Sequence, residues 1–139
     1  MIFVDSNAWV GLVLKTDQYH ELAVKAFENL TSSFTPLITT DFVISETYTF
    51  LRYHTANFKT LLQFENILSE AEASKLLILK WTHPEIFQEA RKIFFKYPDQ
   101  NFSFVDCISF AAARALKIKD IFTFDNDFRT MGFHLIPLA

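Results

Sequence analysis

Four carboxylates stand at places where the sequence predicts that they could act together: Asp5, Glu46, Asp106 and Asp125. Asp5 directly follows the apolar run 2–4, and Asp125 directly follows the apolar run 121–124. In parallel α/β sheets, ligands bind outside the carboxyl ends of the strands, where both aspartates are expected to lie. Taken singly, each aspartate could equally cap the turn that follows it.

The other two acids lie on predicted helices among apolar residues. At helical spacing, the neighbours of Glu46 are Phe42, Val43, Thr49, Phe50 and Tyr53. The corresponding neighbours of Asp106 are Phe102, Ser103, Ser109, Phe110 and Ala113. A carboxylate on such a face must stay protonated or meet a positive charge, because burying an unpaired charge is costly. The alternatives are a hydrogen-bonded Glu46 at the edge of its face and an Asp106 that forms a capping box with Ser103.

If the four acids converge, they repel one another unless a proton or a divalent cation intervenes. Oxygen ligands favour Mg²⁺ or Mn²⁺, which typically serve phosphate chemistry. A zinc site is not indicated, because the one cysteine, Cys107, and the four histidines show no ligand spacing. A glycine-rich phosphate loop is excluded as well, since Gly11 and Gly132 are the only glycines.

The elements that must position these acids alternate along the chain. Short apolar runs predict strands at residues 2–4, 37–39, 76–79, 121–124 and 133–136. Helical periods between them predict helices from about residue 8, at 20–30, from 41, at 58–68, from 82 to 95 and from 103 to 115. We expect Asp41, Thr82 and Ser103 to cap three of these helices, and residues 125–127 to form a turn. Strands separated by helices imply an α/β fold with a central, mostly parallel sheet of four to five strands.

Composition limits the class of protein further. The chain has 139 residues, half of them hydrophobic, which is enough for one domain spanning residues 1–139 with its own core. A single cysteine and the lack of a long apolar run predict a cytoplasmic protein that does not cross a membrane. The net charge is −3; because the four acids contribute −4, the rest of the chain is close to neutral at +1. The overall sign therefore does not exclude a nucleic-acid substrate.

Four short motifs, in order along nearly the whole chain, resemble those of the PIN domain family. The sequence is most similar to the small VapC-type ribonucleases of bacterial toxin–antitoxin systems. The motifs are Val4-Asp5-Ser6-Asn7-Ala8, Ser45-Glu46-Thr47, Ser103-Phe104-Val105-Asp106-Cys107 and Phe122-Thr123-Phe124-Asp125-Asn126-Asp127-Phe128. One departure is Val105, where many relatives have Thr or Ser.

The resemblance implies a PIN-like (Rossmann-like) α/β/α sandwich and a metal-dependent endonuclease that hydrolyses single-stranded RNA. It implies Mg²⁺, with Mn²⁺ able to substitute, and a catalytic and metal-binding quartet made of Asp5, Glu46, Asp106 and Asp125. In that interpretation Glu46 either binds metal or orients the attacking water. Supporting roles would fall to Ser6, Asn7 and Thr123. Asp127 either joins these supporting residues or, as is more typical of its position, caps the turn before Phe128. The implied partners are RNA, a cognate antitoxin protein and a second copy of the chain.

Alternative functions remain open at the level of sequence. One is a PIN-type RNA-processing nuclease without an antitoxin; another is an inactive α/β interaction module whose acids are caps and solvated turns. A phosphatase that uses Asp5 as nucleophile is disfavoured, because Asn7 stands where a second aspartate would be needed. The basic residues that could contact RNA phosphates are scattered, which is also typical of an ordinary surface: Lys15, Arg52, Lys117 and Arg129.

Overall fold

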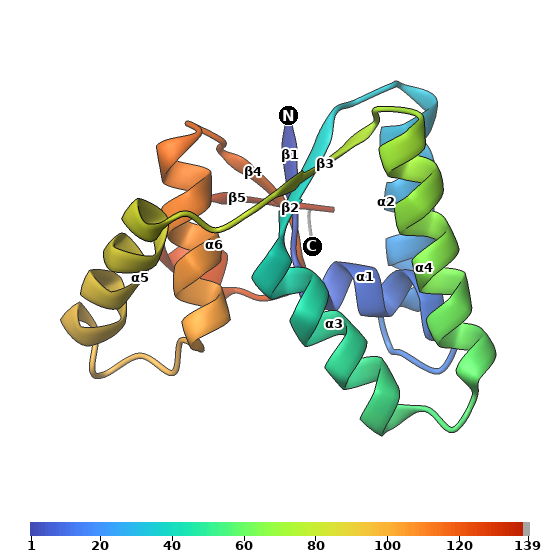
Figure 1. Cartoon of the computed structure of the whole chain (residues 1–139), viewed down its shortest axis with the longest axis horizontal. Coiled ribbons are helices and arrows are strands. Elements are labelled where there is room, and N and C mark those ends of the chain that lie inside the picture. Colours follow the sequence, from blue (N-terminus) through green and yellow to red (C-terminus); the bar gives the residue numbers. More distant parts are fainter. Residues whose placement is uncertain (138–139) are drawn as a thin grey trace.

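A five-stranded, fully parallel sheet forms the centre of the computed structural model, which describes residues 1–137 (Figure 1). The strand order is β3-β2-β1-β4-β5, so β1 is central. The strands are β1 (Ile2–Val4), β2 (Leu37–Thr40), β3 (Leu77–Lys80), β4 (Asp120–Phe122) and β5 (His134–Ile136). The expected α/β class and parallel sheet are confirmed.

The helices cover the sheet in two groups, which gives the expected α/β/α sandwich (Figure 1). The first group contains α1 (Ser6–Val13), α2 (His20–Ser32), α3 (Asp41–His54) and α4 (Phe58–Ala73). The second contains α5 (Pro84–Lys96) and α6 (Phe104–Ala115), and the short α7 (Asp127–Thr130) precedes β5. Among the described residues, no helix combines the length and the apolar character that a membrane span requires.

Two of the predicted helix caps are wrong, and a single interaction explains both. The side chain that caps α3 is Thr40, whose Oγ1 accepts a hydrogen bond from the backbone N–H of Val43 at 3.2 Å. Asp41 instead accepts hydrogen bonds at its Oδ1 from the N–H and the hydroxyl of Thr82, at 3.1 and 2.6 Å. Because the Thr82 hydroxyl is used there, α5 begins one residue later, with His83 at its N-cap position and no side-chain cap.

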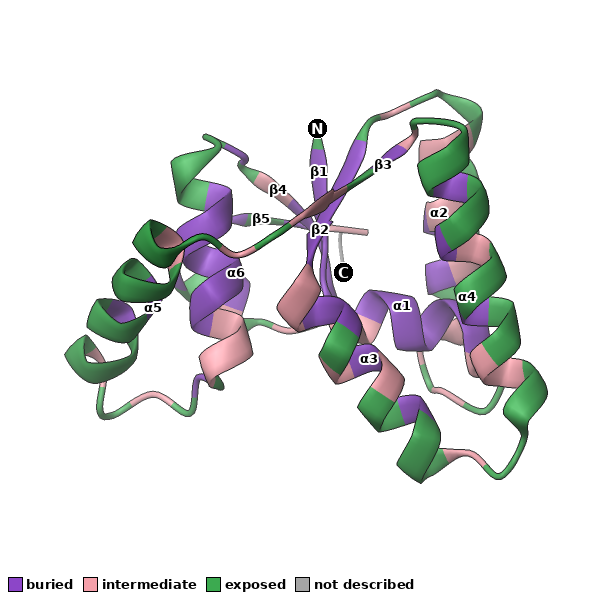
Figure 2. Ribbon diagram, viewed as in Figure 1, coloured by how far each residue is buried: buried purple, intermediate pink, exposed green. Residues whose placement is uncertain are grey.

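The core is rich in aromatic residues, which pack on both sides of the central strands. Figure 2 shows β1 and β2 and much of α1 and α6 among the buried parts of the molecule. On one side of the sheet the ring of Trp9 packs against Phe64 at a centroid distance of 5.7 Å. On the other side Phe110 packs against Phe128 at 4.9 Å. Buried residues 111–113 of α6 are alanines, whose small side chains allow this helix to lie close to the sheet.

Candidate metal centre

The ends of β1 and β4 bring the first and last of the predicted site motifs together. Val4 is paired with Phe122, and the backbone N–H of Asp5 donates to the carbonyl of Phe122 at 3.0 Å. The Asp5 side chain is almost fully buried, with 2% of its surface exposed. Its Oδ2 accepts a hydrogen bond of 2.9 Å from the Thr123 hydroxyl, whereas its buried Oδ1 has no partner among the described residues.

Asn7 and Thr123 shape the loop that carries Asp125. Oδ1 of Asn7 accepts a hydrogen bond from the N–H of Phe124 at 3.0 Å, and this bond ends β4 two residues earlier than the sequence predicted. Asp125 therefore does not directly follow the strand. Its N–H donates to Oγ1 of Thr123 at 3.1 Å. Because a hydroxyl has only one proton, Thr123 can donate to Asp5 or to Asn7, and the shorter contact is to the Asp5 carboxylate.

Asp106 enters the same region from the N-terminus of α6. The predicted capping box is present: the N–H of Asp106 donates to Oγ of Ser103, and the N–H of Ser103 donates to Oδ2 of Asp106, both at 3.0 Å. Within residues 1–137, Oδ1 of Asp106 accepts no hydrogen bond. The capping role foreseen for Asp106 therefore leaves one of its oxygens available to a ligand.

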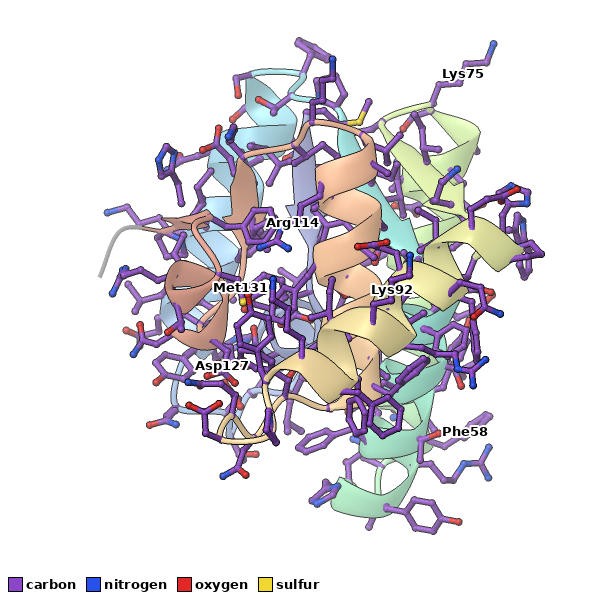
Figure 3. The ribbon with its side chains drawn as sticks, turned by 90° about the vertical axis from the view of Figure 1, so that its left-hand side faces the viewer. Phe58, Lys75, Lys92, Arg114, Asp127 and Met131 are labelled. Carbon is purple, nitrogen blue, oxygen red and sulfur yellow. The ribbon has the colours of Figure 1, made fainter. Side chains whose placement is uncertain are left out.

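Asp127 lies closer to this cluster than the sequence suggested. Carboxylate oxygens of Asp106, Asp125 and Asp127 lie within 4.8 Å of one another. The expected capping role is wrong, because Asn126 holds the N-cap position of α7 and Asp127 is the first helical residue. It is Asp125 that turns the loop, by accepting a 2.9 Å hydrogen bond from the N–H of Asp127. Figure 3 shows Asp127 toward the lower end of the molecule, with Lys75 at the opposite end.

Glu46 lies on α3 beside the cluster and not within this group of three. It is half-buried and lines a cavity of about 640 Å³ together with Phe42, Phe50 and Tyr53. The apolar residues expected around Glu46 are thus present, and they form the wall of a groove. The Glu46 charge contributes to raising the pKa values of Asp5 and Asp106. Ser6 is half-buried at the start of α1. A hydrogen bond from its backbone lowers the pKa of Asp5 and so opposes the effect of the Glu46 charge.

Three of these acids, Asp5, Asp106 and Asp127, have raised pKa values, chiefly because burial disfavours the charged form of a carboxyl group. Desolvation is the largest cause for Asp5, whose pKa rises to about 8, and the charge of Asp106 is the next largest. Desolvation also dominates for Asp106, whose pKa rises to about 6 with contributions from Asp125 and Glu46. The pKa of Asp127 is raised by desolvation and by Asp125. None of these acids forms an ion pair with a basic side chain in the described part of the chain.

These observations fit a hard divalent cation. The donor atoms are all carboxylate oxygens, the donor type that Mg²⁺ and Mn²⁺ prefer. A cation would offset the burial of these charges and their mutual repulsion, which together raise these pKa values, and Oδ1 of Asp5 would gain a partner. Of the predicted quartet, the structure brings Asp5, Asp106 and Asp125 to one edge of the sheet, with Glu46 beside them. Sequence reasoning underrated Asp127, although its position two residues after Asp125 was a usable signal.

A parallel α/β/α sandwich with carboxylates gathered at the carboxyl ends of its central strands defines the class of protein. The chain belongs to the PIN domain family, whose model matches residues 2–134. This confirms the family resemblance.

Two known proteins show how similar the chain is to characterised members. It is 27% identical, over 134 residues, to the 23S rRNA-specific endonuclease VapC20 of Mycobacterium tuberculosis, and the match covers 96% of this chain and 95% of that protein. The crystal structure of VapC20, described as a Sarcin-Ricin loop cleaving toxin, superimposes with a TM-score of 0.80 at 26% identity and covers 96% of each chain. The structure of FitAcB from Neisseria gonorrhoeae, at 17% identity and a TM-score of 0.63 over 97% of this chain and 96% of that chain, supports the fold alone.

Proposed function

We propose that residues 1–139 form a single PIN domain that acts as a metal-dependent, single-strand-specific endoribonuclease, the toxin of a VapBC-type toxin–antitoxin pair. The observation that carries the proposal is the buried Oδ1 of Asp5, which has no hydrogen-bond partner within residues 1–137 and lies at the end of β1, next to the end of β4 that carries Thr123. The similarity to VapC20 along nearly the whole chain supports the RNA substrate.

Asp5, Asp106 and Asp125 would hold the cation, with Asp127 beside them and Glu46 as a further ligand or as the group that orients the attacking water. When bound, Mg²⁺ or Mn²⁺ lowers the pKa of water and offsets the charge of the phosphate and the leaving oxygen. Thr123 fixes Oδ2 of Asp5 and so directs Oδ1 toward the ligand.

The remaining supporting residues, Asn7 and Ser6, would position the loops around the site without contacting the ligand themselves. Asn7 holds the loop of Asp125 through the N–H of Phe124, and Ser6 begins α1 next to Asp5. The same loop carries Thr123, whose hydroxyl accepts the hydrogen bond from the N–H of Asp125. Replacing Asn7 or Thr123 would therefore displace Asp5 and Asp125 together.

The proposed partners are RNA, a cognate antitoxin protein and a second copy of the chain in a cytoplasmic homodimer. Exposed phenylalanines on α5 offer apolar surface for a protein partner: Phe87 and Phe94 are 38% exposed and Phe95 is 75% exposed. Sedimentation of the purified chain tests the dimer. Co-expression with the product of the adjacent upstream reading frame tests the antitoxin, which should restore growth and co-purify with the chain.

The central experiment compares Asp5→Asn and Asp106→Asn with the unchanged chain. We expect both variants to lose RNA cleavage and growth inhibition while they retain the circular dichroism spectrum of the folded protein. Asp120→Asn is the control, because Asp120 lies at the other end of β4 and contacts His134. Cleavage by the unchanged chain should stop in EDTA and return with Mg²⁺ or Mn²⁺. Full toxicity of either site variant would contradict the proposal.

A further inference from the structure

The outer face of α3 connects the acidic cluster to a second cavity that the proposed chemistry does not use. The groove that contains Glu46 continues along the helix past Phe50 and Tyr53 to His54. His54 also lines a second cavity, of about 490 Å³, formed by the end of α1, the loop that follows it and the start of α4. At a rise of about 1.5 Å per residue, Glu46 and His54 are about 12 Å apart along the helix axis.

The middle of this path presents flat aromatic surface to solvent. The rings of Phe50 and His54 are stacked, with centroids 4.0 Å apart and planes inclined by 8°. Nδ1 of His54 lies 3.0 Å from the carbonyl oxygen of Phe50. Because a carbonyl oxygen only accepts, Nδ1 carries the proton in this hydrogen bond. Tyr53 is 80% exposed on the same helix.

The far end of the path is cationic. Lys15, from the loop after α1, and Lys59, from the first turn of α4, both line the second cavity. Neither lysine forms an ion pair in the part of the chain that the structure describes, and no aspartate or glutamate belongs to the lining. The charge of this cavity is therefore opposite in sign to that of the groove at Glu46. Two free cations next to exposed rings are the combination that single-stranded nucleic acids require, since bases stack on aromatic rings and phosphates need positive charge.

We propose that the RNA substrate lies along α3. An unpaired base next to the cleaved bond stacks on Tyr53 and the Phe50–His54 pair, and a phosphate further along the strand binds between Lys15 and Lys59. The proposal rests on the proposed nuclease function and adds a site for the flanking nucleotides. A protein segment would also cover the apolar groove, but it would not account for the acid-free lysine cavity that continues it.

The phosphate contact is tested by the salt dependence of RNA binding. The double variant Lys15→Gln, Lys59→Gln is compared with Lys75→Gln, Lys92→Gln. The second pair removes the same charge from exposed sites that line neither cavity, and Figure 3 labels both residues. All binding is measured with short single-stranded RNA in the cleavage-deficient Asp106→Asn background. Loss of this one phosphate contact should flatten the slope of log affinity against log salt by about 0.7 for the first pair, and the second pair should leave the slope unchanged. Equal slopes for the two pairs would overturn the phosphate site.

The stacking contact is tested with a 2-aminopurine placed in the same RNA, whose fluorescence falls when the base stacks. Tyr53→Leu should weaken binding at least about fivefold and restore the fluorescence, whereas Tyr53→Phe should preserve both because it keeps the ring. If Tyr53→Leu changes only the sedimentation of the protein, the groove is a contact between copies and the proposal is wrong. Cleavage by the unchanged chain is measured separately. If the unchanged chain cleaves RNA but these variants bind RNA as it does, this inference is wrong while the proposed nuclease function stands.

Discussion

Thr123 and Asp5 are 118 residues apart in the chain, yet the hydroxyl of Thr123 donates a 2.9 Å hydrogen bond to the buried carboxylate of Asp5. The same hydroxyl accepts a hydrogen bond from the N–H of Asp125. One side chain thus positions two of the acids that we expect to bind metal. Oδ1 of Asp5 is left buried and without a hydrogen-bond partner within residues 1–137.

Thr123→Val should weaken both metal binding and the fold. Loss of the hydroxyl leaves a buried carboxylate oxygen and a backbone N–H without their partner, which costs about 1–3 kcal/mol of unfolding free energy. Metal affinity should fall by about 10–100-fold, because ligands lose orientation when their hydrogen-bond partners are removed. Urea unfolding and calorimetric titration with Mn²⁺ measure the two effects. Thr123→Ser, which keeps the hydroxyl, should behave like the unchanged chain; unaltered Mn²⁺ affinity in Thr123→Val would contradict this role.

The metal-free protein should become less stable as the pH rises from about 4 to about 8. In this window the folded chain keeps protons on Asp5 and Asp106, whose pKa values are about 8 and about 6, while the unfolded chain has released them from carboxyls of pKa 3.8. The folded state binds more protons, so the unfolding free energy falls with increasing pH and levels off above the folded pKa of Asp5. We expect a melting temperature lower by at least about 5 °C at pH 8 than at pH 5.

Two comparisons isolate the cause of this pH dependence. The double variant Asp5→Asn, Asp106→Asn should show a much flatter profile, because the replaced groups do not titrate. In the unchanged chain, Mg²⁺ at a hundred times its dissociation constant should raise the unfolding free energy at pH 8 by about 2.7 kcal/mol. An equally steep profile in the double variant would assign the pH dependence to other groups.

Asp127→Asn should weaken Mn²⁺ binding about tenfold, since removing one charge from the group formed with Asp106 and Asp125 reduces the attraction for a cation. Calorimetric titration provides the measurement. Asp120→Asn removes the same charge from an exposed pair with His134 and should leave the affinity unchanged. Equal effects of the two substitutions would show that only net charge matters.

Ser103→Ala should destabilise the chain by about 1 kcal/mol, because it removes the side-chain cap of α6. The pKa of Asp106 should rise further, since the Ser103 hydroxyl and backbone both lower it at present. Urea unfolding measures the first effect, and NMR titration of the Asp106 carboxyl measures the second. Ser33→Ala, at an exposed helix end, serves as the reference and should change stability by less than about 0.5 kcal/mol. A pKa that stays at its present value would show that the cap does not orient Asp106.

Much of the fold was predictable because its signals are local. Short apolar runs separated by helical periods identified all five strands, and the alternation predicted their parallel arrangement. The capping box of Ser103 and Asp106 was predictable for the same reason, since its two partners are three residues apart. The acids at the end of β1 and at the starts of helices were likewise expected at one edge of the sheet, because ligands of parallel sheets bind at the carboxyl ends of the strands.

The tertiary structure decided the features whose partners are distant in sequence. Asp41 and Thr82 were both expected to cap helices, but they are 41 residues apart and hydrogen-bond each other, so neither does. Asn7, at the start of α1, ends β4 although it is 117 residues away in the chain, and only the folded loop brings Asp127 close to Asp106. The sequence by itself determined which residue types could bind a cation. Which oxygen of Asp5 remains free for it depends on the hydrogen bond from Thr123, which exists only once β1 and β4 have met.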